Sequence, residues 1–402
     1  MPMEASIYRM RLRDILAMCV LGLLFLGLIM VQSASAKVSN VPSWHFTSAG
    51  AKHAMFVGLS LTIFFLVGRF DYRRLNTRLS LFNPVAWVVA AGFVTCVLVL
   101  VPHVGREVNG ARRWLGYGPV QLQPSELAKW AVVLFLAWWL ANKNDALATF
   151  KGLLLTLIPV AVFAVLIVKE DFGTAALIGL ATVGILLVAN VKWWHLAMVI
   201  PPAAAAGAFS IMHKSYRMHR MTAFLNPWAD PRGVGYHMIQ SLLAFSSGGI
   251  VGNGLGFGIQ KLGYLPEDTT DFIFSIICEE LGIFGAILTV ALYLGILYVV
   301  WQIIRSQRDT FAKLLALGIG CMIGLQAVIN IAVATVSVPT KGLSLPLVSA
   351  GGSGLIITSM ALGLLYSITR FEEEPETVPS LPVEVSVPPT LPVGDLAINL
   401  PA

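Results

Sequence analysis

The segment ILAMCVLGLLFLGLIMV, residues 15–31, carries no charged side chain over its whole length. Apolar runs of this kind recur along the chain. They are about 17–25 residues long, the length that a helix needs to cross the hydrocarbon core of a bilayer. Because lipid offers no hydrogen-bond partners, a spanning backbone must form helices or a closed barrel. Barrel strands would instead alternate in polarity over about ten residues. The runs therefore predict an all-α, polytopic integral membrane protein.

The composition excludes a water-soluble protein. Of the 402 residues, 57% are hydrophobic and 12% are charged, whereas soluble domains have about 25% charged residues. The net charge of +6 fits basic side chains that anchor helices at anionic lipid headgroups, so membrane lipid rather than nucleic acid is the expected partner. All four cysteines lie inside apolar runs without a CxxC spacing, which favours packing over disulfides or metal ligands.

We expect about ten membrane spans, since ten helices of about 20 residues would take about half of the chain. The first run is preceded by Arg9, Arg11 and Arg13 and resembles a secretory signal. Its apolar core exceeds the usual length of about 7–15 residues, so we expect it to be retained. The predicted spans are 14–33, 54–70, 83–102, 124–142, 152–169, 172–190, 194–212, 272–304, 312–337 and 347–369.

The even number of spans places both chain ends on one side of the membrane. Fourteen of the 27 basic residues fall on that side, in short tails and loops, where the positive-inside rule has force. We therefore expect cytoplasmic termini, with segments 103–123 and 213–271 on the outer face. Residues 1–370 would form the transmembrane domain, and the proline-rich stretch 371–402 would be a disordered cytoplasmic tail.

Three acidic residues lie at membrane depth near the predicted eighth span. Asp271 opens this span, and Glu279 and Glu280 lie two turns further along. On a helix, Glu279 would lie about 80° and Glu280 about 180° from Asp271, so Asp271 and Glu279 could line one cavity. Carboxylates at this depth indicate a functional site or a buried ion pair. Alternatively, Thr270 and Asp271 are natural N-cap residues for the helix.

Two further acids stand at the outer ends of predicted helices. Glu126 and Lys129 are one turn apart in Gln-Pro-Ser-Glu-Leu-Ala-Lys, which fits either an ion pair at a helix start or a ligand contact. Asp171, in Lys-Glu-Asp-Phe-Gly-Thr, repeats the pattern of an acid at a helix start.

Cations cluster in the outer segments. Arg112 and Arg113 precede Trp114, a combination that fits a membrane anchor or a clamp for a phosphorylated lipid headgroup. Lys261 follows a series of glycines, and Lys341 lies between two prolines in the last outer loop. The glycines at 248–258 lack the preceding strand and the Gly-Lys-Ser/Thr of a phosphate loop. They more plausibly let the backbone bend into a shielded cavity.

These residues fall within motifs that, in order, resemble the SEDS family over about residues 10–370. The matching motifs are Asn109-Gly-Ala-Arg-Arg-Trp114, Gln123-Pro-Ser-Glu-Leu-Ala-Lys129, Tyr216-Arg-Met-His-Arg220, Phe224-Leu-Asn-Pro-Trp228, Gly235-Tyr, Gln240-Ser, Leu265-Pro-Glu, Thr270-Asp-Phe-Ile-Phe274, Glu279-Glu-Leu-Gly282, Pro339-Thr-Lys-Gly342 and Ser349-Ala-Gly-Gly-Ser353.

The resemblance implies a ten-span peptidoglycan glycosyltransferase of the bacterial cytoplasmic membrane that uses lipid II on the outer face. It implies that Asp271 is the essential acid. The motifs look closer to the division branch of the family than to its elongation branch, which implies action at the division septum. A class B penicillin-binding protein of the division type and other division proteins would then be partners. A divalent cation, magnesium or manganese, is also implied, but the sequence shows no clear ligand set.

Three departures from the family pattern concern the same motifs. Thr269 stands where the family usually has histidine, Glu170 where it has proline, and Ala350 where it has tyrosine. None of them removes Asp271, Lys129 or Arg113.

The predicted reaction transfers a disaccharide from a polyprenyl diphosphate to an acceptor hydroxyl. Asp271 would be the base, and Arg112, Arg113, Lys129 and Lys261 would bind the diphosphate through charge-assisted hydrogen bonds. Trp114, Glu126, Asp171, Glu279, Glu280 and Lys341 are the other predicted substrate contacts. A lipid II flippase, an elongation polymerase and a catalytically silent scaffold are the alternatives.

Overall fold

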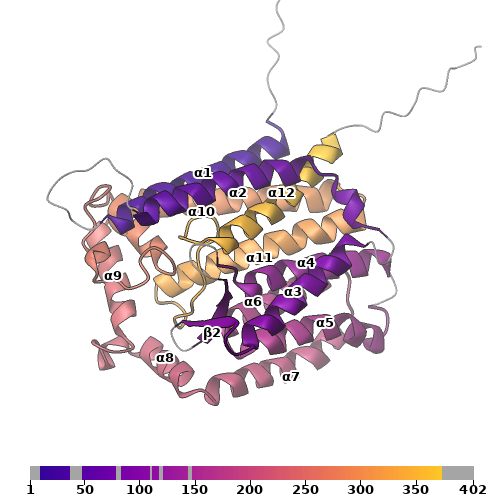
Figure 1. Ribbon diagram of the computed structural model, residues 1–402, viewed down its shortest axis with the longest axis horizontal. Helices are drawn as coiled ribbons and strands as arrows, with labels where there is room; N and C mark the ends of the chain where they lie inside the picture. Colours follow the sequence, from indigo (N-terminus) through magenta and orange to yellow (C-terminus); the bar gives the residue numbers. More distant parts are fainter. Residues whose placement is uncertain are drawn as a thin grey trace, which may run out of the picture.

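The structure is a computed structural model, and it describes residues 10–36, 48–77, 83–108, 111–116, 121–143 and 147–373. Long helices dominate these ranges, as the apolar runs predict (Figure 1). The predicted tail lies outside the described residues beyond Glu373, so its disorder stays a prediction.

A long helix lies at each of the ten predicted positions. They are α1 (Leu12–Ser35), α2 (Ser48–Arg69), α3 (Pro84–Leu100), α4 (Pro124–Asn142), α5 (Phe150–Val168), α6 (Phe172–Val188), α7 (Trp193–Met212), α10 (Ile273–Ser306), α11 (Thr310–Ala334) and α12 (Ser353–Glu373). Within the described residues, seven are long and apolar enough to cross a membrane, namely α1, α2, α5, α7, α10, α11 and α12. Helices α3 and α6 are apolar but only 17 residues long.

Local sequence explains where several helices begin. Asn83 accepts hydrogen bonds from the N–H groups of Val85 and Ala86 and so caps α3, whose first residue is proline. Asp309 caps α11 in the same way. Such side chains satisfy N–H groups that have no partner inside the helix. Proline suits the first turn because its missing N–H would be unpaired there anyway.

Two predicted spans differ in detail from the helices. The last predicted span begins at residue 347, but α12 begins at Ser353, because the backbone before it forms a buried turn in which Leu347 has a φ of 64°. Helix α10 is interrupted at Gly282, where φ is 63° and ψ is −154°. Only glycine adopts this conformation readily.

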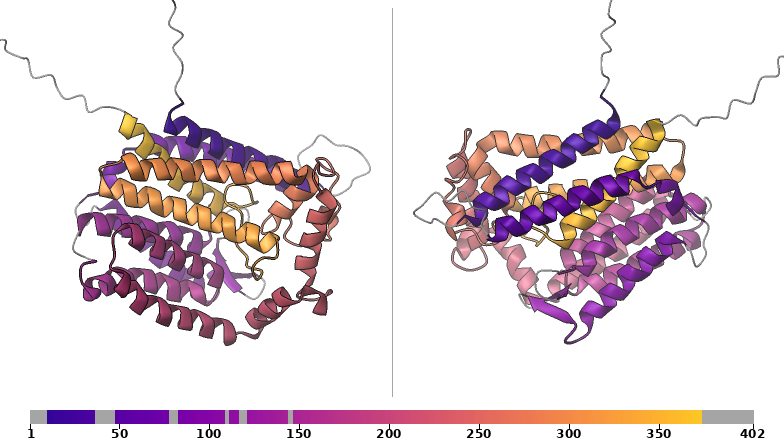
Figure 2. Two further views of the ribbon diagram at one scale, coloured as in Figure 1. Left: turned by 180° about the vertical axis from the view of Figure 1, so that it is seen from behind. Right: turned by 45° about the horizontal axis from the view of Figure 1, so that its top comes forward.

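The helices form a bundle with α4 and α11 in its interior (Figures 1 and 2). Helix α11 packs against α4, α6 and α10, while α1 packs on α10 and α2 packs on α12. Helix α7 is the exception, because only its Leu196 is buried. An apolar helix that is exposed on nearly all sides fits contact with lipid.

The two long outer segments fold at one end of the bundle. Segment 103–123 contains an antiparallel hairpin that the sequence analysis did not predict, with β1 (Gly105–Val108) and β2 (Ala111–Leu115). Segment 213–271 contains α8 (Ser215–Leu225), η2 (Pro227–Ala229), α9 (Tyr236–Gly248) and η3 (Gln260–Leu262). The start of α1 and the end of α12 lie together at the opposite end (Figures 1 and 2).

This arrangement predicts the topology that reporter fusions would reveal. A reporter after Arg370 should be cytoplasmic and one inserted near Gly233 should be external, because the end of α12 and the start of α9 lie at opposite ends of the bundle and the short basic loops favour cytoplasmic termini. Alkaline phosphatase activity, which requires export, measures the difference. High phosphatase activity from the fusion after Arg370 would contradict the predicted orientation.

Candidate functional site

Asp271 lies in an irregular segment between η3 and α10. The N-cap of α10 is Phe272, and no side chain caps this helix start. The interpretation of Asp271 as a helix cap is therefore wrong. Among the described residues, none donates a hydrogen bond to its carboxylate, although the side chain is partly buried. The carboxylate is thus left open to a ligand.

The charges around Asp271 come from four different parts of the chain. Burial is the main reason why the pKa of Asp271 rises to about 7, and the acids Glu267 and Asp171 raise it further, whereas Arg220 and Arg113 lower it. A carboxyl group with this pKa exchanges its proton readily near neutral pH, which suits a general base.

Gly342 lies between Asp271 and Arg113. A Cβ atom placed on Gly342 would lie 3.3 Å from Oδ2 of Asp271 and 3.8 Å from Nη1 of Arg113. The acid and the guanidinium therefore both approach the loop that follows Lys341. The sequence predicted both residues for the site, and the structure brings them together.

The hairpin positions Arg113 by its contacts with the corner between α5 and α6. The Nε of Arg113 donates to the carbonyl oxygen of Glu170 at 2.7 Å. The backbone N–H of Arg112 donates to the Glu170 carboxylate at 2.8 Å, and the Arg112 side chain pairs with Glu107 at 3.5 Å. Trp114 is half-buried on the same strand. The departure from proline at Glu170 therefore supplies a carboxylate that holds the hairpin.

Asp171 is buried and caps α6. Its carboxylate accepts hydrogen bonds from the N–H of Thr174 at 3.1 Å and from its hydroxyl at 2.7 Å, and Ser125 donates to it at 3.4 Å. A small cavity beside it is lined by Arg112, Arg113, Ser125, Glu170 and Asp171, together with apolar side chains. Two arginines and two acidic residues therefore line the same small cavity.

Two more cations approach from the outer loops. The ammonium of Lys341 lies 5.1 Å from the centre of the Phe172 ring, and burial lowers the pKa of Lys341. Arg220 of α8 donates to the carbonyl of Thr340 at 3.4 Å. The sequence analysis named Lys341 but not Arg220. The sequence shows the spacing of the Tyr-Arg-Met-His-Arg motif, but it does not show which cation of this motif acts on Asp271.

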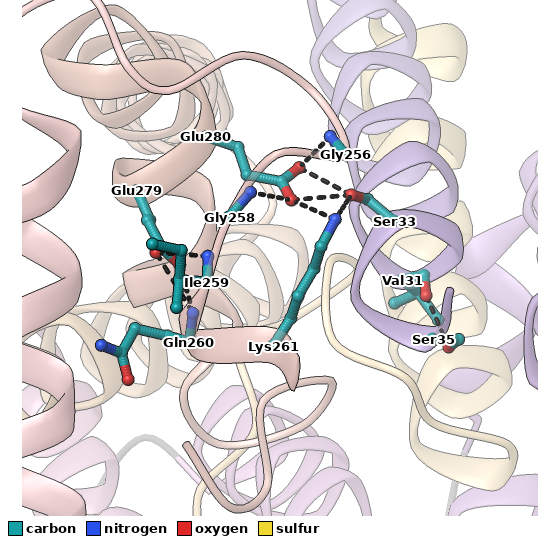
Figure 3. A network of polar contacts seen from close by, with 10 residues as sticks. All are labelled: Val31, Ser33, Ser35, Gly256, Gly258, Ile259, Gln260, Lys261, Glu279 and Glu280. Carbon is teal, nitrogen blue, oxygen red and sulfur yellow. Dashed lines mark hydrogen bonds and ion pairs between the residues drawn. The ribbon is translucent and has the colours of Figure 1, made fainter. Parts of the chain in front are cut away.

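Lys261, Glu279 and Glu280 form a separate network (Figure 3). The Lys261 ammonium donates to Oε1 of Glu280 at 2.7 Å, and both side chains are fully enclosed. Ser33 of α1 donates to the same carboxylate at 2.7 and 2.8 Å. The structure thus pairs Lys261 inside the protein, whereas the sequence prediction placed it on a diphosphate.

The two glutamates hold the glycine-rich segment by its backbone. Glu280 accepts hydrogen bonds from the N–H groups of Gly256 and Gly258, and Glu279 accepts them from Ile259 and Gln260 (Figure 3). Both side chains reach the same segment, and neither of them forms a hydrogen bond with Asp271 among the described residues. The shared cavity of Asp271 and Glu279 stays a prediction.

The break in α10 makes room for this arrangement. Because Gly282 leaves the helical conformation, the carbonyl groups of Glu279 and Glu280 are free to accept hydrogen bonds from Asn253 at 3.0 Å and Gly254 at 2.9 Å. The N–H of Ile283 donates in return to Ile250 at 3.1 Å. The glycines thus let the backbone bend into a shielded position, as predicted.

Lys129 and Glu126 form the predicted ion pair of α4. Their charged atoms are 2.9 Å apart, and Lys129 is completely buried. Lys129 also donates to Gln326 of α11 at 2.7 Å. Glu126 and Gln326 line a second small cavity with the 344–355 loop. The pair therefore links α4 to α11 beneath the loop that carries Lys341.

The divalent cation that the family resemblance implies stays a prediction. Among the described residues, no group of three or more His, Cys, Asp or Glu side chains converges on one point. The side chains of Arg220 and Arg113 supply positive charge near Asp271.

Comparisons with known proteins agree with this architecture. The family model of cell cycle proteins named for FtsW, RodA and SpoVE matches residues 13–374. One relative, named probable peptidoglycan glycosyltransferase FtsW of Nitrosococcus halophilus, is 39% identical over 87% of this chain and 91% of its own length. Another of the same name, from Coxiella burnetii, is 36% identical over 88% of this chain and 95% of its own length.

Solved structures share the fold. A chain from a structure described as "Structural coordination of polymerization and crosslinking by a peptidoglycan synthase complex" matches with a TM-score of 0.71 and 28% identity, over 90% of this chain and 98% of that one. The rod shape determining protein RodA of Thermus thermophilus matches with a TM-score of 0.63 and 28% identity, over 90% and 97%.

A substitution of Lys261 distinguishes its role in the buried ion pair with Glu280 from a role in substrate binding. Replacing Lys261 by Met should destabilise the fold by about 3–5 kcal/mol, because it leaves the buried Glu280 carboxylate without its cation. The double variant with Glu280→Gln should be less destabilised than the sum of the single variants. Unfolding followed in detergent micelles measures both. A stable Lys261→Met protein that uses lipid II poorly would instead favour the substrate contact.

Proposed function

Because the chain belongs to the family of cell cycle proteins that comprises FtsW, RodA and SpoVE, we propose that it polymerises lipid II into glycan strands. It is a peptidoglycan glycosyltransferase, as its relatives at 36–39% identity are named. The substrate and the residue roles below are our proposal. The observation that carries them is the partly buried carboxylate of Asp271, on which Arg113 of the hairpin and Arg220 of α8 act.

In the proposed reaction, the acceptor hydroxyl attacks the anomeric carbon of the donor sugar. The new carbon–oxygen bond forms as the bond from that carbon to the diphosphate breaks, and Asp271 takes the hydroxyl proton. A base placed within hydrogen-bond reach of this proton lowers the barrier. Its pKa of about 7 leaves a substantial fraction of Asp271 ionised at neutral pH.

The departing diphosphate needs compensating positive charge. We assign this role to Arg113 and Arg220, whose charges act on Asp271, and to Lys341, which precedes Gly342 beside the Asp271 carboxylate. Arginine suits this role because its guanidinium can donate two parallel hydrogen bonds to the oxygens of one phosphate. Arg112 and Trp114 would contact the substrate at the rim, and Asp171 would fix the position of the α6 start beside it.

The predicted site residues that are buried would support the site without contacting the substrate. Lys129 and Glu126 would support the last outer loop from below through Gln326. Lys261, Glu279 and Glu280 would fix the segment that leads to Asp271. A divalent cation brought in with the diphosphate remains part of the proposal, with no step assigned to it.

We further propose that the chain works at the division septum with a class B penicillin-binding protein. The names of the relatives support the division setting. The description of the similar complex, which couples polymerization to crosslinking, supports a transpeptidase partner. The termini would be cytoplasmic and the site external, since they lie at opposite ends of the bundle.

The substitution Asp271→Asn tests the base. It keeps the volume of the side chain but removes the proton acceptor, so polymerisation of lipid II should fall by about 100- to 10,000-fold. The purified protein should stay folded, because the Asp271 carboxylate makes no hydrogen bond with the described residues. The matched control is Asp309→Asn, which changes the cap of α11, since asparagine caps as well as aspartate.

Normal polymer yield from folded Asp271→Asn would rule out the base while leaving the family intact. Movement of labelled lipid II across vesicles by a wild-type protein that makes no polymer would favour a flippase.

The pH dependence gives a second test. Polymerisation should rise as the pH passes through about 7 and then level off, because only the ionised form of Asp271 accepts a proton. The free energy of unfolding should change in the opposite direction and fall as the pH rises. The raised pKa means that the folded state favours the protonated form, so this contribution is present at low pH and is lost as the pH rises through about 7. A rate that is flat from pH 5 to about pH 9 would contradict the assignment.

A further inference from the structure

Helix α11 presents two amide side chains one turn apart toward the last outer loop. The Nε2 of Gln326 donates to the carbonyl of Ser344 at 2.8 Å. The Nδ2 of Asn330 donates to the carbonyl of the preceding residue, Leu343, at 2.7 Å. Residues at i and i+4 lie on the same face of a helix. The helix therefore holds two successive carbonyl groups of an extended loop that would otherwise lack partners.

Asn330 also holds the segment that carries the proposed base. The same Nδ2 atom donates to the backbone carbonyl of Asp271 at 2.8 Å. One NH₂ group thus uses its two hydrogens on two different loops. The orientation of the amide follows from this, because both neighbours are acceptors and the oxygen could not take the place of the nitrogen.

The two loops are also joined directly to each other. The hydroxyl of Ser349 donates to the carbonyl of Thr270 at 2.6 Å, and the N–H of Ala350 donates to the carbonyl of Thr269 at 2.8 Å. The N–H of Leu345 donates to Ser349 at 2.7 Å. These contacts make one unit of segments 269–271 and 343–350. Asn330 attaches this unit to a helix of the bundle interior.

Asn330 is completely buried, and its Oδ1 atom has no hydrogen-bond partner among the described residues. A buried acceptor without a partner costs free energy. Packing alone would be served better by an apolar side chain of the same size. The amide of Asn330 therefore contributes to the structure through the two hydrogen bonds that it donates.

We propose that Asn330 is a positioning residue for Asp271, setting the place of the proposed base relative to the loop that bears Lys341 and Gly342. The inference rests on the proposed function for its effect on catalysis. Asp271 precedes α10, so no helical hydrogen bonds fix its backbone. Its carboxylate is nevertheless close to Gly342, which the same loop carries. Losing the Asn330 contacts detaches the Asp271 and Leu343 carbonyl groups from α11.

The test compares Asn330→Leu, which keeps the size without the donors, with the smaller Asn330→Ser. The matched control is Thr182→Val, which removes a buried hydroxyl that bonds only within α6. Lipid II polymerisation is measured over a range of pH, with kcat and KM separated, and the folded fraction is measured for each purified protein. Hydrogen exchange of segment 267–275 gives a readout that does not depend on activity.

Both Asn330 variants should lower kcat by about 10- to 100-fold, because a small misplacement of a catalytic group has effects of this size. KM should change less than about twofold. The pH midpoint of the rate should fall, because a released Asp271 carboxylate is better hydrated. Exchange in 267–275 should increase, and Thr182→Val should match the wild type in every measurement.

A loss of rate in proportion to the unfolded fraction, with an unchanged pH midpoint, would overturn the positioning role. Unchanged exchange in both folded variants would overturn it as well. If the wild-type protein makes no polymer, the proposed function fails, and hydrogen exchange still decides whether Asn330 holds the Asp271 segment.

Discussion

Polar groups near the membrane must find partners inside the protein, because lipid supplies none. This constraint applies where the chain leaves regular helix, as it does in the segments around 249–272 and 335–352. The first is held by the carboxylates of Glu279 and Glu280, with Lys261 balancing charge. The second is held by the amides of Gln326 and Asn330. Irregular backbone is therefore tolerated where helix side chains supply its hydrogen bonds.

The same contacts sort the charged residues into two groups. Lys261 with Glu280 and Lys129 with Glu126 are enclosed pairs, and removing one partner of such a pair leaves a costly unpaired charge. Asp271 differs, because no described residue donates to its carboxylate and its neighbouring cations act from a distance. The enclosed pairs fix the framework, whereas Asp271 is the acid to which we assign a role in the proposed reaction.

The sequence predicted much of this from local properties. Run length and polarity placed all ten long helices, and motif order identified the family, while the role of Asp271 as the essential acid stays a prediction. What it missed depends on contacts between distant segments. The cap interpretation of Asp271 was wrong because α10 starts after Phe272. Lys261 was assigned to substrate because nothing in its local pattern shows that Ser33 and Glu280 enclose it. Arg220 could not be chosen among its neighbours for the same reason.

The departures from the family pattern also gain a physical meaning. Thr269 and Ala350 are joined by a backbone hydrogen bond of 2.8 Å, so two positions where the family has larger side chains are neighbours in the unit that carries Asp271. Smaller side chains at both neighbouring positions can be accommodated together, whereas a smaller side chain at one position alone would leave a mismatch in packing. Glu170, the third departure, adds a hydrogen bond of its carboxylate to the hairpin that carries Arg113. All three departures thus lie in segments that support Asp271 or Arg113.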